Sequence, residues 1–340
     1  MTTADIDRDL VDMMDAVFAG HRQTAIEVSE VELDREFWQQ LGELGLTRLT
    51  GTEESGGSGA GWYEACQLLT AAARHGVRIP LAEHDLLACW TLHEAGLPVD
   101  GAVRTVCVLD DDGTARGVPW AACVDRIVAI YQCDSGYRVV DLDAAAATIS
   151  RGTNNIGEPR DAVSVDISAL DGVTIRVGLV STLRMKSALV RAVQTCAVLD
   201  RILEMSVEHV NARIQFGRPL ARIQAVQHLI ADIAAEAGLA RAATEAALDA
   251  AVASSWQAPD LHFSVAVARS CVGHAASVVV RNAHQVHGAI GTTREHALHE
   301  YTRAALAWRS EFGSVRHWDD EVTRAALASG GTGLWALIAG

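Results

Sequence analysis

A chain of 340 residues is long enough to bury a large core and to form two or three domains. Its composition, 49% hydrophobic and 21% charged, is ordinary for a soluble globular protein. The net charge of -15 argues against nucleic acid and anionic membrane surfaces as partners, because both recruit clustered Lys and Arg.

The cysteines and the N-terminus indicate the compartment. The seven cysteines are odd in number and never spaced as C-x-x-C, which is typical of thiols kept reduced in a cytoplasm. The first ten residues are acidic and contain no apolar run, so no signal peptide is expected. Apolar stretches such as Ala192–Leu203 are interrupted by polar residues, so no membrane span is expected either. We therefore predict a cytoplasmic protein.

The first hundred residues have the apolar spacing of helices. Apolar residues recur at intervals of three and four, which predicts helices over 10–18, 37–46, 62–75 and 81–95. The Gly-rich segment 53–59 between two of them is a loop by composition. We assign residues 1–101 to an N-terminal helical domain.

The pattern changes to strands near residue 102. Short runs rich in β-branched residues predict strands over 103–109, 125–131, 137–142 and 173–177. Residues 102–182 are therefore expected to form a short middle β domain.

From about residue 183 the chain has helical spacing again. We predict a long helix from near Leu183, then helices over 223–254, 263–287 and 294–308. Residues 183–328 are expected to form a C-terminal four-helix bundle, and 329–340 a tail. The predicted fold class is thus mostly α with a small β domain.

Residues 213–224 read R-I-Q-F-G-R-P-L-A-R-I-Q and follow the long helix, so we expect a corner between two helices. Gly217 permits a tight backbone, and Pro219 can open the next helix. The Arg213 guanidinium could pair with a pyrophosphate, and the Phe216 ring could stack on an adenine or a ribose. A plain helix corner with a surface arginine and a core phenylalanine explains this segment equally well.

Residues 285–291 read Q-V-H-G-A-I-G and end the third helix of this region at Gly288. Two glycines let a backbone approach a phosphate closely, and amides beyond them can donate to it. The alternative is an ordinary glycine helix cap.

Together, in this order, the two segments resemble the flavin-contacting motifs of the acyl-CoA dehydrogenase family. The loop E-E-x-G-G-x-G and residues 117–125 are similar to parts of that family's first and middle domains. The resemblance covers about 30–315 and implies the family's fold and its cofactor, FAD. It also implies contacts with the ADP half of a neighbouring subunit's flavin, made by Arg213, Phe216, Gln224, Gln285 and Gly288.

The same resemblance reveals missing parts. Nothing between Leu97 and Val124 resembles the family's T-E-P-x-x-G-S-D loop, which cradles the isoalloxazine ring. The family's reaction removes an acidified α-proton and needs a carboxylate base. The slot for that base holds Phe312, with Glu311 one residue early, and the slot used by another branch falls near Ser187. The catalytic base is therefore unknown, with Glu311 as the remaining candidate.

The histidines offer two pairs with helical spacing. His284 with His287, and His296 with His299, lie three residues apart and could share a helix face. No nearby Cys or paired carboxylate completes a ligand set. Packed or surface histidines are therefore expected, and no metal site is predicted.

The resemblance, with its kept motifs and its missing parts, implies an FAD-binding partner subunit of a heteromeric acyl-CoA dehydrogenase that acts on an acyl-CoA thioester. Short, base-lacking chains resemble the smaller subunits of actinobacterial α2β2 dehydrogenases for CoA thioesters of steroid side chains. In that arrangement a longer subunit holds the isoalloxazine ring and supplies the Glu. Three alternatives stay open: a self-sufficient homotetramer that uses Glu311, a non-catalytic scaffold, and a flavin monooxygenase on the same fold.

Overall fold

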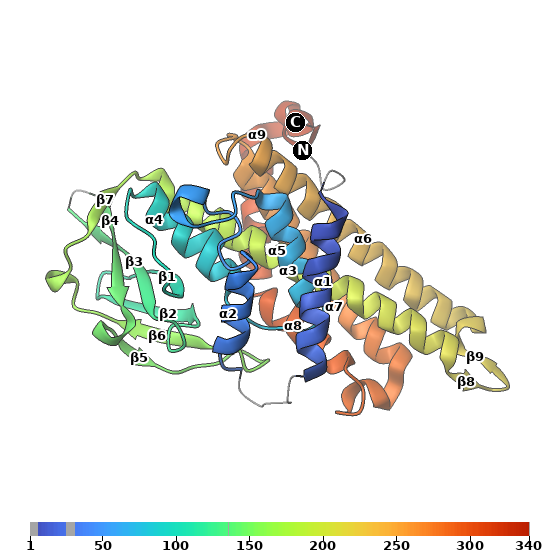
Figure 1. Cartoon of the computed structure of the whole chain (residues 1–340). Helices are drawn as coiled ribbons and strands as arrows, with labels where there is room; N and C mark the ends of the chain where they lie inside the picture. Colours follow the sequence, from blue (N-terminus) through green and yellow to red (C-terminus); the bar gives the residue numbers. More distant parts are fainter. Residues whose placement is uncertain (1–5, 25–30, 135, 340) are drawn as a thin grey trace. The chain divides into compact units, whose positions relative to one another are not determined.

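The computed structural model describes residues 6–24, 31–134 and 136–339. The chain forms two compact units, residues 1–186 and 187–340, and each is described by itself. The first unit contains the N-terminal helices and both larger sheets, and the second contains the helical bundle (Figure 1). The fold class predicted from the sequence is confirmed. The three-domain division stays a prediction.

The N-terminal helices are α1 (Arg8–Thr24), α2 (Arg35–Glu43), α3 (Trp62–Arg74) and α4 (Trp90–Glu94). Asp34 caps the N-terminus of α2, and its carboxylate accepts a hydrogen bond from the Phe37 amide at 2.9 Å. The Phe37 ring meets Phe18 of α1 edge to face, with ring centres 6.0 Å apart. The apolar spacing therefore identified these helices because their buried faces pack on one another.

Residues 82–89 depart from the expected α-helix. They form the π-helix η3 (Ala82–Cys89), which continues directly into α4. All eight of its side chains are buried, including those of Glu83, His84 and Asp85. π-helical turns are rare and often occur near functional sites, and apolar spacing alone cannot distinguish them from α-helix.

A buried lysine lies between two tryptophans in the first unit. The Lys186 side chain is 2% exposed, and its ammonium nitrogen is 4.4 Å from the ring centre of Trp62 and 4.5 Å from that of Trp90. Burial lowers the pKa of Lys186 to about 7, although nearby Glu94 and Asp85 favour the charged form. The two rings give a desolvated ammonium a cation–π partner on each side.

The described residues of the first unit include two sheets, whose strands are β1 (Arg104–Val108), β2 (Thr114–Pro119), β3 (Arg126–Cys133), β4 (Gly136–Asp143), β5 (Thr148–Ser150), β6 (Arg160–Ser164) and β7 (Val173–Ile175). The first sheet has the order β1-β3-β4-β7, with β1 parallel to β3 and the other pairs antiparallel. The second sheet is antiparallel, in the order β2-β6-β5. Four strands match the prediction, whereas β2, β5 and β6 were not predicted.

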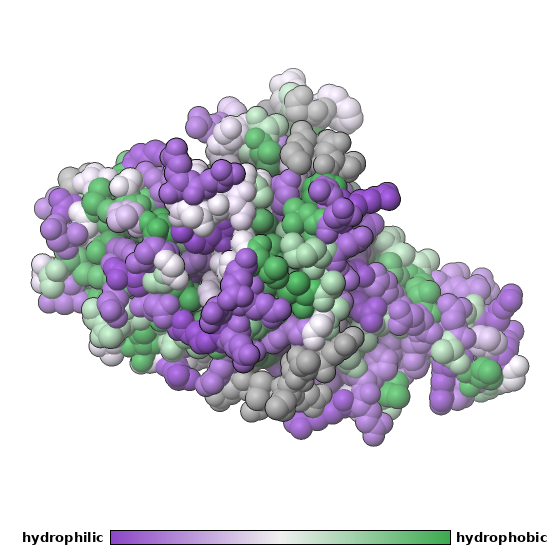
Figure 2. Space-filling view, in the orientation of Figure 1, coloured by the Kyte–Doolittle hydropathy of each residue, from purple (hydrophilic) through white to green (hydrophobic). Residues whose placement is uncertain are grey.

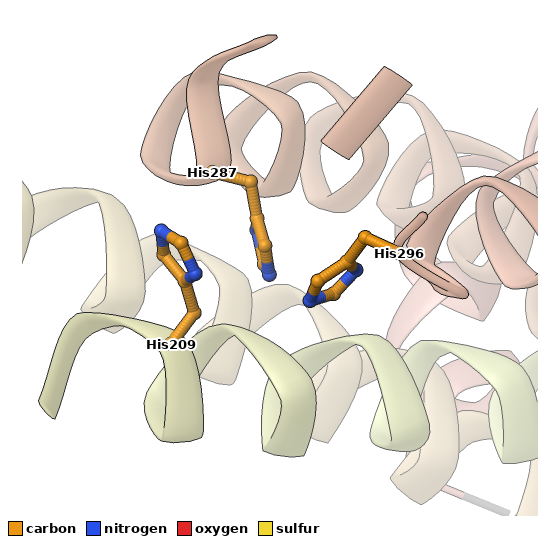
Figure 3. A group of neighbouring side chains, drawn as sticks. All are labelled: His209, His287 and His296. Carbon is orange, nitrogen blue, oxygen red and sulfur yellow. The ribbon is translucent and has the colours of Figure 1, made fainter. Parts of the chain in front are cut away.

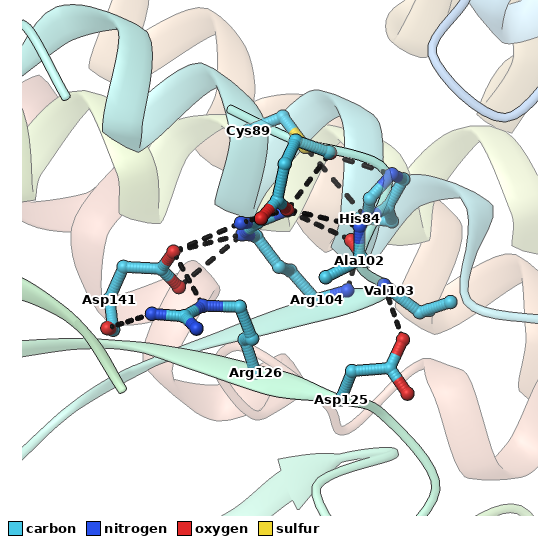
Figure 4. A network of polar contacts seen from close by, with 9 residues as sticks. His84, Cys89, Ala102, Val103, Arg104, Asp125, Arg126 and Asp141 are labelled. Carbon is cyan, nitrogen blue, oxygen red and sulfur yellow. Dashed lines mark hydrogen bonds and ion pairs between the residues drawn. The ribbon is translucent and has the colours of Figure 1, made fainter. Parts of the chain in front are cut away.

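A buried polar network fixes η3 to the first sheet (Figure 4). The Arg104 side chain is 1% exposed and lies 3.0 Å from the Asp141 carboxylate, which also accepts from Arg126 at 2.8 Å. The Arg104 amide donates to Nδ1 of His84 at 3.0 Å. Burial and the Arg104 charge lower the pKa of His84 to about 3, so its neutral ring remains an acceptor.

The second unit contains most of α5 (Gly178–Ala212) together with α6 (Gln224–Ala253), α7 (Leu261–His287), α8 (Leu298–Trp308) and α9 (Val315–Ala339). Arg241 of α6 pairs with Asp200 of α5 at 2.8 Å, which ties these two helices together. Helices α5 to α8 follow the prediction closely, although α8 begins later than expected. The residues expected as a tail from 329 are helical as far as Ala339, with a break at Gly330.

Helix α7 is the centre of this unit, packed against α6, α8 and α9. Among the described residues, Leu261–Thr292 is long and apolar enough to cross a membrane, and 56% of its most apolar window is buried. The core helix of a soluble bundle has the same composition, since it is apolar on nearly every side.

Candidate functional site

The first flavin-like segment forms a β-hairpin, not the expected helix corner. Strands β8 (Ile214–Gln215) and β9 (Arg218–Pro219) pair antiparallel between α5 and α6. Phe216 and Gly217 form the turn, with φ of 52° and 76°. Positive φ at both central residues defines the type I′ turn, whose twist matches paired strands. The segment does join two helices as predicted, but as a hairpin, and Pro219 does not open the next helix, which begins at Gln224.

Phe216 lies at the tip of this hairpin, and its side chain is 87% exposed. The alternative of a core phenylalanine is thereby excluded. A non-glycine residue in the left-handed region costs about 1–3 kcal/mol, and such residues cluster at ligand sites. Figure 2 shows hydrophobic surface at the end of the bundle that carries β8 and β9, and Ile214 there is 63% exposed. The hairpin thus presents apolar surface outward.

Arg213 lies at the base of the hairpin. Its amide donates to the His209 carbonyl at 2.8 Å, and its own carbonyl accepts from Leu220 at 2.9 Å. These bonds fix the backbone while the side chain is exposed. Gln224, the first residue of α6, is also exposed. A cation, an aromatic ring and an amide therefore face outward within twelve residues of chain.

The second segment ends α7 as predicted. Gly288 is the C-terminal cap, with φ 63°, and both it and Gln285 are exposed. A Cβ atom added at Gly288 would have no atom within 4 Å, so open space lies beside this backbone. The rings of His209 and His287 stack with centres 4.4 Å apart. This stack places the end of α5 beside the end of α7, and so brings the two segments to the same end of the unit.

Glu311, the candidate base, is held in an ion pair. Its Oε2 accepts from Nε of Arg191 at 2.7 Å, and the two side chains are 16% and 2% exposed. The guanidinium carbon of Arg191 lies 5.2 Å from the ring centre of Phe312. The Glu311 carboxylate thus points at the buried Arg191 guanidinium, which donates a hydrogen bond to it and balances its charge. Ser187, at the other slot, is buried and carries no carboxylate.

A second buried arginine fixes the backbone of the same loop, residues 309–314. Nη2 of Arg269 donates to the carbonyl of Glu311 at 2.7 Å and lies within 3.4 Å of the carbonyls of Trp308, Arg309 and Gly313. Burial and the Arg191 charge lower the pKa of Arg269 to about 10, so the group stays charged at neutral pH. The negative end of the α8 dipole also stabilises a cation at this position.

Neither arginine was predicted as part of the site, because each lies inside an apolar helix pattern, far along the chain from the loop. A charged residue within such a pattern is the signal in the sequence, since a buried arginine needs a partner.

Comparison with known proteins identifies the family. Residues 180–328 match the acyl-CoA dehydrogenase C-terminal domain, and residues 6–98 match the acyl-CoA dehydrogenase N-terminal domain. The chain belongs to the acyl-CoA dehydrogenase family. This acyl-CoA dehydrogenase is 28% identical to acyl-CoA dehydrogenase FadE27 of Mycobacterium tuberculosis, over 89% of this chain and 92% of the relative. It is 27% identical to acyl-CoA dehydrogenase IpdE2 of Mycolicibacterium smegmatis, over 82% and 83%.

Solved structures share its fold. The ChsE4-ChsE5 complex from Mycobacterium tuberculosis matches with a TM-score of 0.82 and 23% identity, over 96% of this chain and 99% of that chain. The Tcur3481-Tcur3483 steroid ACAD variant matches with a TM-score of 0.83 and 22% identity, over 95% and 98%. The prediction of an acyl-CoA dehydrogenase-like fold is confirmed.

Acyl-CoA dehydrogenases are oxidoreductases that use FAD, and membership of the family gives this chain the same activity class and cofactor. The described residues fit the ADP end of that cofactor. Arg213 offers an exposed cation, Phe216 an exposed ring, and Gly288 a backbone with open space beside it. These are the groups that phosphates, an adenine and a close backbone approach require.

Proposed function

We propose that this chain is the subunit that lacks the catalytic base in a heteromeric acyl-CoA dehydrogenase, which desaturates an acyl-CoA thioester between its α and β carbons. FAD, when bound, accepts the hydride of that reaction. This chain contributes Arg213, Phe216, Gln224, Gln285 and Gly288 to the ADP end of the flavin. A longer partner holds the isoalloxazine ring and supplies the carboxylate base, in an α2β2 assembly in the cytoplasm.

One observation carries this proposal: the chain keeps the groups that would contact a partner's flavin and lacks a free carboxylate at the position of the base. The groups suited to a partner's cofactor are exposed, with Phe216 strained at the tip of a hairpin. The carboxylate nearest the base position is committed to a buried guanidinium at 2.7 Å. A chain with exposed flavin-contacting groups and no available base is suited to complete the active site of a neighbouring subunit.

The comparisons support the heteromer and suggest the acyl group. Two of the similar structures carry names of paired chains, ChsE4-ChsE5 and Tcur3481-Tcur3483, and the second is called a steroid ACAD. A CoA thioester of a steroid side chain is therefore the substrate that we propose.

The test is a flavin count on the chain alone and on the chain co-expressed with a longer dehydrogenase encoded beside it. We expect the chain alone to be nearly colourless, and the complex to be yellow and active on acyl-CoA thioesters. A chain that alone carries one flavin per copy and turns over substrate would overturn the proposal in favour of the homotetramer that uses Glu311. Steroid thioesters and straight-chain thioesters assayed side by side test the substrate class.

A further inference from the structure

Three histidines from separate segments of the second unit face one another. His209 lies in the last turn of α5, His287 ends α7, and His296 lies between η7 (Gly288–Thr292) and α8. The ring centres are 4.4 Å apart for His209 and His287, 4.9 Å for His287 and His296, and 6.2 Å for His209 and His296. One side-chain nitrogen of each ring lies within 4.8 Å of the other two. Figure 3 shows these rings turned toward a common space.

The His287 ring is fixed in a form that offers a lone pair. Its side chain is 5% exposed, and its Nδ1 lies 2.8 Å from the carbonyl of Ala283. A carbonyl only accepts, so Nδ1 carries the hydrogen and Nε2 carries the lone pair. Among the described residues, Nε2 has no hydrogen-bond partner. A buried polar atom left unpaired costs about 1–3 kcal/mol, so Nε2 needs a partner beyond the described residues, and a lone pair can take a hydrogen-bond donor or a metal.

The His287 ring also has the orientation of a metal ligand. A ring whose Nδ1 donates to a carbonyl is the usual geometry of a histidine ligand, and its Nε2 then carries the lone pair that a metal needs.

We propose that His209, His287 and His296 form a site for a divalent transition metal of the zinc class. Three imidazoles are a known ligand set for Zn²⁺, with a fourth position left for water or an anionic oxygen. At Zn–N bonds of about 2.0–2.1 Å, tetrahedral geometry places the nitrogens about 3.3 Å apart. Closure from the present spacing of up to 4.8 Å requires rotation of the rings of His209 and His296, both of which are half-buried.

His296 must make the larger adjustment. Its Nδ1 accepts the Leu298 amide at 3.1 Å. Binding through Nε2 requires Nδ1 to carry the ring hydrogen, so this bond is given up when the metal binds. Helical spacing pairs His284 with His287 and His296 with His299 but does not reveal this set, because His209 lies far back in the chain on another helix.

The experiment uses the full chain without an affinity tag, alone and in its complex, after EDTA treatment and dialysis. Titration with Co²⁺ is followed by visible absorption, and Zn²⁺ is then used to displace it. We expect one Co²⁺ per chain with a ligand-field band of nitrogen coordination, and stoichiometric displacement by Zn²⁺. His287→Gln should weaken binding at least tenfold, since even the loss of an orienting contact costs about 10–100-fold.

The matched control is His274→Gln. His274 is on the same helix, is 63% exposed and lies 3.0 Å from Asp319, so it is a rival surface ligand. We expect this variant to bind Co²⁺ as the wild type does. His209→Gln, at a half-buried position, replaces His287→Gln if circular dichroism shows that the latter is unfolded. Absence of a ligand-field band in the wild type would overturn the site, and so would His209→Gln and His287→Gln variants that bind Co²⁺ as tightly as the wild type. Loss of binding in His274→Gln alone would overturn it too.

Discussion

Replacing Glu311 with Gln separates a structural carboxylate from a catalytic one. The Glu311–Arg191 pair joins Oε2 to Nε at 2.7 Å, and Arg191 is 2% exposed. Breaking a buried pair by removing one charge costs about 3–5 kcal/mol, whereas a hydrogen bond to a charged group contributes about 1.5–3 kcal/mol. Gln keeps one acceptor oxygen toward Arg191, so we expect a loss of about 2–3 kcal/mol in the free energy of unfolding. For a unit of this size that loss lowers Tm by roughly 5–10 °C.

The assay is thermal unfolding together with steady-state turnover of the assembled complex. We expect the fall in Tm with kcat within a few-fold of wild type, because in the proposed function the partner supplies the base. Asp320→Asn is the matched control, since Asp320 is 62% exposed and lies 3.9 Å from exposed Arg316. Surface pairs contribute less than about 1 kcal/mol, so this variant should change neither quantity appreciably. In the double variant with Arg191→Met, the two stability losses should not add, because both remove one interaction.

The opposite result would refute the reasoning. If Glu311→Gln leaves Tm unchanged and lowers kcat by about two to four orders of magnitude, with flavin still bound, then Glu311 is the general base. The same change at the candidate base of the partner should then have little effect on kcat.

Three further outcomes are expected. Arg213→Ala should weaken FAD binding in the complex about ten- to a hundredfold without lowering Tm, and Arg213→Lys should weaken FAD binding too. Equilibrium dialysis of flavin measures both affinities. An unchanged affinity would show that Arg213 is only a surface residue of the hairpin. Phe216→Gly should leave Tm equal or higher, because it removes a strained turn residue, yet release flavin faster; unchanged release would remove the ring from the site. Stability in urea should rise between pH 7 and 8 by up to about 1.4 kcal/mol through Lys186. The pKa of Lys186 is lowered from 10.5 to about 7, so the folded state binds fewer protons than the unfolded state in this range. Lys186→Met should flatten the slope of the free energy of unfolding against pH. An unchanged slope would show that the ammonium between Trp62 and Trp90 is not its source.

The helices were predictable because one apolar face of each is buried, and that face repeats at the helical period. The strands were harder. Strand β2 contains Gly117 and Pro119, which read as turn residues, and β5 spans only Thr148–Ser150. Such strands are set by their partners in the sheet and not by their own propensity. The same limit explains the hairpin, since Phe216 is not a typical residue for a type I′ turn.

The candidate site was predictable only where neighbours in sequence form it. The two flavin-like segments could be found because each is a short motif with special backbone residues. The pairing of Glu311 with Arg191 could not, because the partners are 120 positions apart and each alone looks unremarkable in the chain. Whether a carboxylate is a base or half of an ion pair depends on that tertiary contact.

The π-helix η3 has a consequence for how relatives should be aligned with this chain. A π-helical segment bonds each residue to the fifth along instead of the fourth, so it contains one residue more than an α-helix would need. Deleting one residue within 82–89 would let the segment close to an ordinary α-helix, because the wide turn already accommodates the extra residue and the flanking turns keep their register. Trp90 would then still face Lys186, and the buried ammonium would keep both of its rings. Relatives that are one residue shorter here should therefore align with a gap inside 82–89 and still be able to carry Trp at position 90 and Lys at position 186.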